Sequence, residues 1–283
     1  MAADFHFTSR FLNNSVFILD CLRSNESQTG LKLYEELRDI RDYDKVDVYI
    51  EHIRVLDAGA LRQALDRIHT LALEGFKPII HFECHGDEEV GLEIGDVADL
   101  TSWDALEPLL RRINVACGCN LGVVMGVCWG MYAITPIRIH RPVPFYFLVG
   151  SQTQLTAGTL REEMPAFYRT LLQNGSLEAA MKCVPSCQPF HAEKLLAVGF
   201  AKYLKRGCIG KGRSERVERL FTEIYQSSGG NLNRAQRRNV RESFRKQSRA
   251  EAQESAFSRY ARTFLHGKPC SFTFADLLSW VRS

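Results

Sequence analysis

The chain has 283 residues, of which 45% are hydrophobic and 24% charged, and its formal net charge is +3. This balance is typical of a globular protein with one sizeable core. It excludes a membrane-spanning helix, because no apolar run approaches the roughly 20 residues that one needs. The N-terminus lacks the basic start and apolar centre of a signal peptide. We therefore expect a cytoplasmic protein, in which the nine cysteines are thiols and not a disulfide framework.

Short apolar runs alternate with helical patterns over the first 150 residues. Strands are predicted, in chain order, at residues 15–22, 46–55, 78–83, 122–127 and 145–149. Helices are predicted between them at 31–40, 58–74 and 101–113, and a small hairpin at 90–96. This alternation is typical of a mostly parallel sheet that is covered by helices on both faces.

Helical periodicity dominates the second half of the chain. Helices are predicted at 160–173, 190–206, 214–226, 232–265 and 274–282, and 227–231 reads as a linker. From Lys202 to Arg249 there are 14 Lys or Arg against 4 Glu, a local charge of +10, which leaves the remainder near −7. We therefore expect a core at 1–185 and a basic helical extension at 186–283 that packs on the core or regulates it.

Two predicted strands end at chemically capable residues. His85, followed by Gly86, comes after the strand at 78–83, and Cys128 comes after the strand at 122–127. One strand-plus-helix crossover separates them, so these strands can be parallel neighbours whose carboxyl ends meet at a ligand-binding crevice. A thiol is a good nucleophile when a neighbouring base favours its thiolate. We predict Cys128 as nucleophile and His85 as its base, with the amides of Gly86 and Cys128 as an oxyanion hole.

The sequence resembles the catalytic core of caspase-like (clan CD) cysteine peptidases, especially the bacterial CHAT-type group related to separase. The resemblance rests on His-Phe-Glu-Cys-His-Gly at 81–86, the hairpin at 90–96, the Trp103 helix and the strand ending in Cys128. It implies a caspase-like three-layer sandwich and a cysteine endopeptidase that cuts protein or peptide substrates through an acyl-enzyme, without a cofactor. Some bacterial relatives act in antiphage defence by cleaving partner proteins such as gasdermins, and the resemblance implies a similar role here.

The resemblance also suggests residues that bind substrate. Caspases carry Gln, and metacaspases Asp, two residues before the cysteine, whereas this chain has Gly126. Asp20 lies at the carboxyl end of the first strand, where relatives place a contact to the P1 residue, the substrate residue that supplies the scissile carbonyl. The resemblance therefore implies a basic P1 residue. The stretch 148–158 resembles the strand and loop that border the substrate cleft, which nominates Ser151 and Gln154.

Two other interpretations of the cysteine stay open. Gly126-Val-Cys-Trp-Gly130 fits a nucleophile elbow like that of class I glutamine amidotransferases, with His191 and Glu193 as the downstream pair. Against it, the separation of Cys128 and His191 is short, and His85 with Gly86 is left unexplained. In the other interpretation the chain is a catalytically inactive caspase-like interaction module.

The remaining motifs predict partners and metals only weakly. The basic extension is interpreted first as a solvated helix packed on the body, and next as a surface for an acidic regulatory protein partner or for autoinhibitory docking on the acidic body. It does not favour nucleic acid, because neither interleaved aromatic residues nor a known reader motif accompanies the charge. Cys183, Cys187 and His191 are loosely spaced and lack an evident fourth ligand, so no metal site is expected.

Overall fold

A computed structural model of the chain describes residues 5–9 and 11–283, which form two compact units. The sheet unit comprises Ser9–Ala192 together with Phe264–Lys268. The helical unit comprises residues 5–8, Glu193–Thr263 and Pro269–Ser283. The sequence boundary at 185/186 falls before the strand at Gln188–His191, which belongs to the sheet unit because its backbone pairs with a central-sheet strand.

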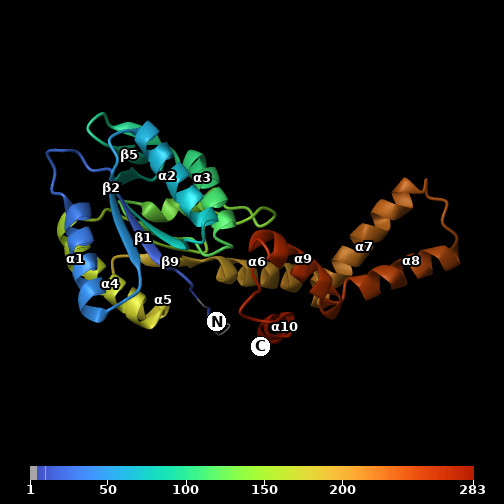
Figure 1. Cartoon of the computed structure of the whole chain (residues 1–283). Helices are drawn as coiled ribbons and strands as arrows, with labels where there is room; N and C mark the ends of the chain where they lie inside the picture. Colours follow the sequence, from blue (N-terminus) through green and yellow to red (C-terminus); the bar gives the residue numbers. More distant parts are fainter. Residues whose placement is uncertain (1–4, 10) are drawn as a thin grey trace. The chain divides into compact units, whose positions relative to one another are not determined.

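The sheet unit is built on a six-stranded sheet with the order β2-β1-β3-β7-β8-β9 (Figure 1). Its strands are β1 (Ser15–Asp20), β2 (Tyr49–Arg54), β3 (Pro78–Glu83), β7 (Gly122–Gly126), β8 (Phe147–Gly150) and β9 (Gln188–His191). All neighbours pair in parallel except β9, which runs antiparallel to β8. The predicted α/β class with a mostly parallel sheet is therefore confirmed.

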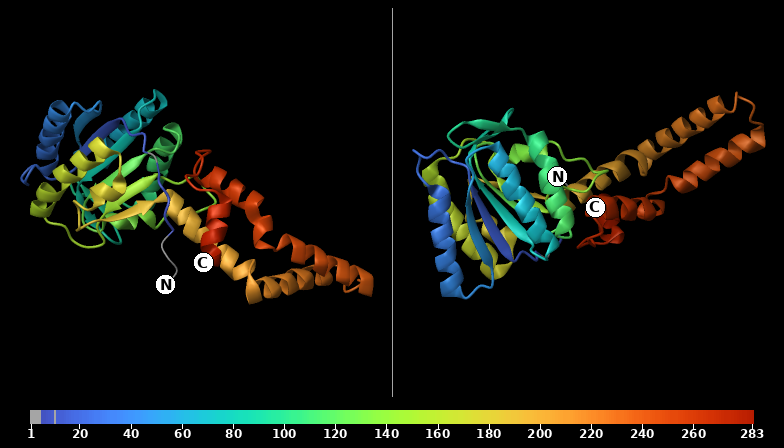
Figure 2. Two further views of the ribbon diagram at one scale, coloured as in Figure 1. Left: turned by 90° about the horizontal axis from the view of Figure 1, so that it is seen from below. Right: turned by 45° about the horizontal axis from the view of Figure 1, so that its top comes forward.

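Helices cover both faces of this sheet, as Figures 1 and 2 show. On one side lie α1 (Thr29–Asp44), α4 (Ala157–Asn174) and α5 (Leu177–Met181). On the other lie α2 (Ala58–Leu73) and α3 (Trp103–Ala116). Side chains of Asp57, Ser102 and Thr156 cap α2, α3 and α4 by accepting a backbone N–H of the first turn. The sheet and its two helical coverings make three layers.

The three central strands are buried along their whole length. Every residue of β1, β3 and β7 is buried, as expected for parallel strands with both faces covered. Burying one large aliphatic or aromatic side chain contributes about 1.5–3 kcal/mol. This core fixes the register in which Glu83 at the end of β3 faces Gly126 at the end of β7.

A second, smaller sheet follows β3 directly. It consists of β4 (His85–Asp87), β5 (Gly91–Ile94) and β6 (Asp99–Thr101), all antiparallel. The sequence predicted only a hairpin at 90–96 because β4 is three residues long and carries no alternating pattern. His85 is therefore the first residue of β4. It directly follows β3 and Cys84, which are both buried.

Within the described residues, the helical unit has its own aromatic core. Its elements are α6 (Ala192–Gly207), α7 (Gly210–Ser227), α8 (Arg234–Gln247), a 3-10 turn (Ala250–Gln253), α9 (Glu254–Phe264) and α10 (Phe274–Arg282). Phe257 contacts both Phe272 and Phe274, and the ring centre of Phe5 lies 5.0 Å from that of Trp280. The single helix predicted at 232–265 is broken after Gln247, where the chain leaves α8 and enters the 3-10 turn.

The stretch predicted as a linker is the turn between α7 and α8. These two helices contact each other through stacked pairs: the Arg241 guanidinium lies 3.6 Å from the Phe221 ring centre, and Arg237 lies 5.0 Å from that of Tyr225. Arg241 also pairs with Glu218. No residue of α8 is buried, so α8 is held to α7 by these surface contacts. Throughout the described chain, no helix combines the length and the apolar character that crossing a membrane requires.

Candidate active site

His85 and Cys128 lie at the same edge of the central sheet. Because β3 and β7 are adjacent and in register, Glu83 is opposite Gly126, and His85 and Cys128 each follow two residues later. Both side chains line one cleft of about 240 Å³ at the carboxyl ends of these strands. The structure therefore brings together the thiol and the imidazole that the sequence nominated.

Gly86 packs against the peptide group of Cys128. A Cβ atom added at Gly86 would lie less than 3.0 Å from the Cys128 carbonyl oxygen, closer than real Cβ atoms approach, so only glycine fits without a backbone shift. The glycine after the histidine therefore keeps β4 tight against the residue that carries the thiol.

The backbone around Cys128 holds its sulfur in place. Trp129, which follows it, has a φ of 54°, in the left-handed region, and its N–H donates to the Thr153 carbonyl at 3.1 Å. The Leu155 N–H donates to the Cys128 Sγ at 3.3 Å. The Cys128 thiol in turn donates to the Leu155 carbonyl at 3.7 Å. The loop after β8 thus positions the sulfur.

Glu26 orients His85. Its Oε1 lies 2.8 Å from His85 Nε2, and the imidazole is nearly half exposed. Because a carboxylate can only accept a hydrogen bond, Nε2 carries the proton and Nδ1 of the neutral ring is left as the base. The arrangement of a base that is itself oriented by a third group is typical of activated nucleophiles.

Glu26 is itself fixed by its neighbours. Arg23 donates its backbone N–H to Glu26 Oε2 at 2.9 Å, and its guanidinium pairs with Glu93, which faces His85 across the small sheet. Burial raises the pKa of Glu26, but the hydrogen bonds from the Arg23 N–H and His85 outweigh this, so its pKa lies below the ordinary value of 4.5. Glu26 is therefore ionised at neutral pH, and its bond to His85 weakens only as the pH falls below that value.

The sequence did not identify Glu26. It lies in the polar loop after β1, 59 residues before His85, and no local pattern distinguishes it from other loop carboxylates. Leu155 was missed as well, because its contact to the sulfur is made by its backbone. Only folding brings Glu26 into contact with His85, and Leu155 into contact with Cys128.

The predicted substrate-binding residues fall in different places. Gly126 lines the cleft beside Cys128. Asp20 is fully buried, pairs with His52 and Arg54, and lies on β1, one strand farther from Cys128 than β3. It does not line the cleft.

The two polar residues predicted in the loop after β8 do not line the cleft either. Ser151 is buried and accepts a hydrogen bond from the Thr153 N–H at 3.0 Å. Gln154 is exposed. In this loop, Leu155 is the residue that both contacts Cys128 and lines the cleft.

The rival histidine is far from the sulfur. His191 on β9 faces Phe147, which in turn faces Gly122 at the start of β7. Cys128 follows six residues later, about 20 Å along the strand direction at 3.3 Å per residue. His191 Nε2 is instead 2.7 Å from Ser9 Oγ. The structure does not bring the amidotransferase-like pair to the cysteine.

Two further observations concern possible metal ligands and similarity to known proteins. Among residues 5–9 and 11–283, no three His, Cys, Asp or Glu side chains are grouped so as to hold a metal ion. No protein-family model matches the chain, and no curated protein matches it in sequence.

Proposed function

We propose that the chain is a cysteine endopeptidase of the caspase-like class. The observation that supports this most directly is the shared cleft of Cys128 and His85, with Gly86 packed against the Cys128 peptide group. A carboxylate on the imidazole adds the third, orienting group that is typical of an activated nucleophile and its base.

In the proposed reaction, His85 Nδ1 takes the proton of the Cys128 thiol, and the thiolate attacks the scissile carbonyl carbon. The backbone amides of Gly86 and Cys128 donate to the oxygen that becomes negatively charged. His85 then gives its proton to the leaving amine as the C–N bond breaks, which leaves an acyl-enzyme on the sulfur. Water, deprotonated by His85, hydrolyses this thioester. Each step uses groups of the chain, the substrate and water.

A peptide acyloxymethyl ketone tests the proposal. We expect this reagent to label Cys128 alone among the nine thiols, since Cys128 lines the cleft that would hold the peptide, together with His85. Burial raises the pKa of other thiols, to about 11 for Cys117 and Cys187 and to about 12 for Cys270. Labelling is measured by peptide mass spectrometry.

The Cys128→Ala variant is the control for that experiment. It should lose both the label and the new N-termini that the wild-type enzyme generates in a proteome. Labelling spread over several thiols, or fragments that persist in the variant, would refute a peptidase and leave the inactive interaction module as the better description.

The Glu26→Gln substitution tests the orientation of His85. Loss of the carboxylate removes the charge that stabilises the imidazolium, so we expect kcat/KM to fall about 10-fold at neutral pH, the size of effect of one charged hydrogen bond. A neighbouring negative charge favours the protonated form of an imidazole, so the acid limb of the activity profile should move to lower pH when that charge is removed. The pH dependence of kcat/KM measures both effects.

The matched control is Glu89→Gln, which removes an exposed carboxylate from the turn after β4. It should change neither kcat/KM nor the position of the acid limb. An unchanged acid limb in Glu26→Gln would show that Glu26 does not act on His85.

We further propose a cytoplasmic setting and a protein partner for the helical unit. All nine cysteines are free thiols, which suits a reducing compartment. The hairpin of α7 and α8 carries 11 Lys or Arg against 4 Glu over residues 210–249, a charge that fits an acidic regulatory partner. A role in antiphage defence, in which the enzyme cleaves a partner protein, rests on the resemblance to CHAT-type peptidases.

A further inference from the structure

A second carboxylate lines the cleft and takes no part in the proposed chemistry. Glu83, the last residue of β3, is 2% exposed, and it lines the cleft that contains Cys128 and His85. The Thr29 hydroxyl donates to its Oε2 at 2.8 Å, and His81 Nε2 lies 3.1 Å from its Oε1. A buried carboxylate is costly unless it is hydrogen-bonded and neutralised. Thr29 and His81 hold the carboxylate in position at the wall of the cleft.

Gly126 makes this carboxylate reachable from the cysteine. A Cβ atom added at Gly126 would lie 3.2 Å from Glu83 Oε1 and 3.0 Å from His81 Nε2, so any side chain there would stand against the carboxylate. Glycine leaves that space to the cleft. Gly126 lies two residues before Cys128, a rise of about 6.6 Å along a strand. A substrate side chain that starts at the sulfur must therefore be long to meet Glu83.

We infer that Glu83 is the specificity determinant of the peptidase and selects lysine or arginine at P1. The inference rests on the proposed function. The side chains of lysine and arginine are long enough to reach from Cys128 to Glu83. Their cationic ends can donate charge-assisted hydrogen bonds to the carboxylate and neutralise it. Leu160 and Ala157 of α4 line the same cleft and provide apolar surface for the stem.

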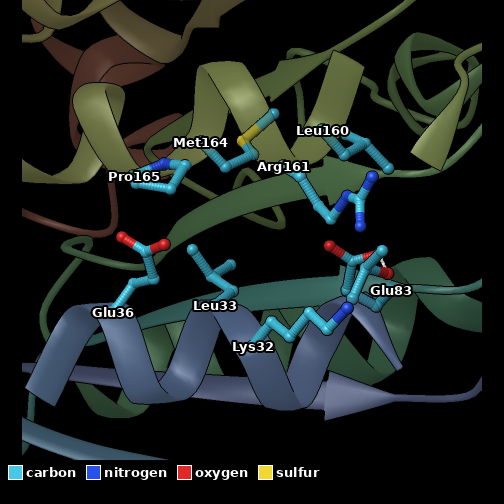
Figure 3. Close-up of a pocket in the computed structure, with 9 residues that line it drawn as sticks. Lys32, Leu33, Glu36, Glu83, Leu160, Arg161, Met164 and Pro165 are labelled. Atoms are coloured by element: carbon cyan, nitrogen blue, oxygen red, sulfur yellow. Dashed lines mark hydrogen bonds between the residues drawn. The ribbon is translucent and has the colours of Figure 1, made fainter. Parts of the chain in front are cut away.

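A smaller cavity of about 70 Å³ adjoins Glu83 and contains the main competing charges. Figure 3 shows Lys32 of α1 and Arg161 of α4 reaching toward the Glu83 carboxylate, with Glu36 farther along the cavity. Both cations are exposed, and they line this cavity but not the catalytic cleft. They offset part of the charge of Glu83 when no substrate is bound, and a P1 cation would reach the carboxylate from the other side.

A library of peptides that differ only at P1 tests the inference. For the wild-type enzyme we expect kcat/KM to be about 10- to 100-fold higher with P1 lysine or arginine than with P1 glutamine or methionine, the range of one buried charge-assisted hydrogen bond. In Glu83→Gln that preference should fall by the same factor, while cleavage after the neutral residues is kept. The fold should persist, because glutamine has the same shape as glutamate. His81 contacts residue 83 through Nε2 and the Tyr168 Oη through Nδ1, at 3.0 Å, so a change of its tautomer can restore both hydrogen bonds.

Glu36→Gln is the matched control, since it removes a carboxylate from the smaller cavity and leaves the cleft intact. It should preserve the P1 preference, and thermal unfolding should confirm that all variants are folded. Preference for aspartate or glutamate at P1 would show that Lys32 and Arg161 dominate and would overturn the inference, as would an unchanged preference in Glu83→Gln. Both outcomes leave Cys128-dependent cleavage in place. If no P1 residue gives Cys128-dependent cleavage or labelling, the proposed function fails and the inference with it.

Discussion

Replacing His85 by alanine is expected to lower kcat/KM about 10²- to 10⁴-fold, the usual contribution of a positioned acid–base group. The imidazole is the only base that the described part of the cleft offers with a hydrogen bond to an orienting carboxylate. Without it, neither deprotonation of the Cys128 thiol nor protonation of the leaving amine is assisted. Steady-state cleavage of a fluorogenic peptide measures the loss.

His191→Gln is the comparison that separates the peptidase from the amidotransferase interpretation. His191 lies level with the start of β7, so its replacement should leave kcat/KM within about 2-fold of wild type after correction for the folded fraction. Loss of activity in the His191 variant alone would reject the dyad of Cys128 and His85.

Gly86→Ala should lower kcat/KM about 10²- to 10³-fold, the size of effect that removing an oxyanion donor has. The added methyl group would overlap the Cys128 carbonyl oxygen, so β4 must move away from Cys128. This displaces the Gly86 amide and the neighbouring imidazole together. Because the ring and the sulfur need to be aligned within a fraction of an ångström, a small shift is enough.

Gly158→Ala is the control for that substitution. Gly158 lies in the first turn of α4, where an added Cβ would have its nearest neighbour, the Thr156 hydroxyl, at an ordinary 3.6 Å. We expect no loss of activity and unchanged or slightly raised stability, because alanine favours a helix over glycine. Activity and thermal unfolding of the two variants should be measured side by side. Full activity in Gly86→Ala would remove the glycine from the oxyanion hole.

The inner strands of the sheet could be predicted from the sequence because each is a mostly apolar run, whereas β9 (Gln188–His191) has no such run and was not predicted. Residues 78–83 were predicted as a strand and form β3, and 122–127 was predicted where β7 ends at Gly126. Parallel strands in a covered sheet leave this continuous pattern. The small sheet could not be predicted in full, because β4 and β6 have three residues each and are defined by pairing with β5.

The sequence indicated that the strands before His85 and Cys128 can be neighbours, but it did not indicate where the first strand lies relative to them. A carboxylate at a strand end was expected to serve the P1 residue, and the sequence nominated Asp20. In the folded sheet, Asp20 and Glu83 are register partners, but β3 lies between β1 and β7, so Glu83 is the one beside Gly126. Asp20 is engaged instead by His52 and Arg54. Strand order, which the sequence did not specify, decides between the two carboxylates.

The surface placement of α8 bears on how this protein can change over evolution. None of its side chains is buried, and exposed substitutions usually alter stability by no more than about 0.5 kcal/mol. Mutations can therefore accumulate along this helix with little cost to folding, provided that Arg241 keeps its place over Phe221. The buried strands that deliver Cys128 and His85 have no such freedom. Selection can thus change the surface of this helix while the strands that carry Cys128 and His85 stay fixed.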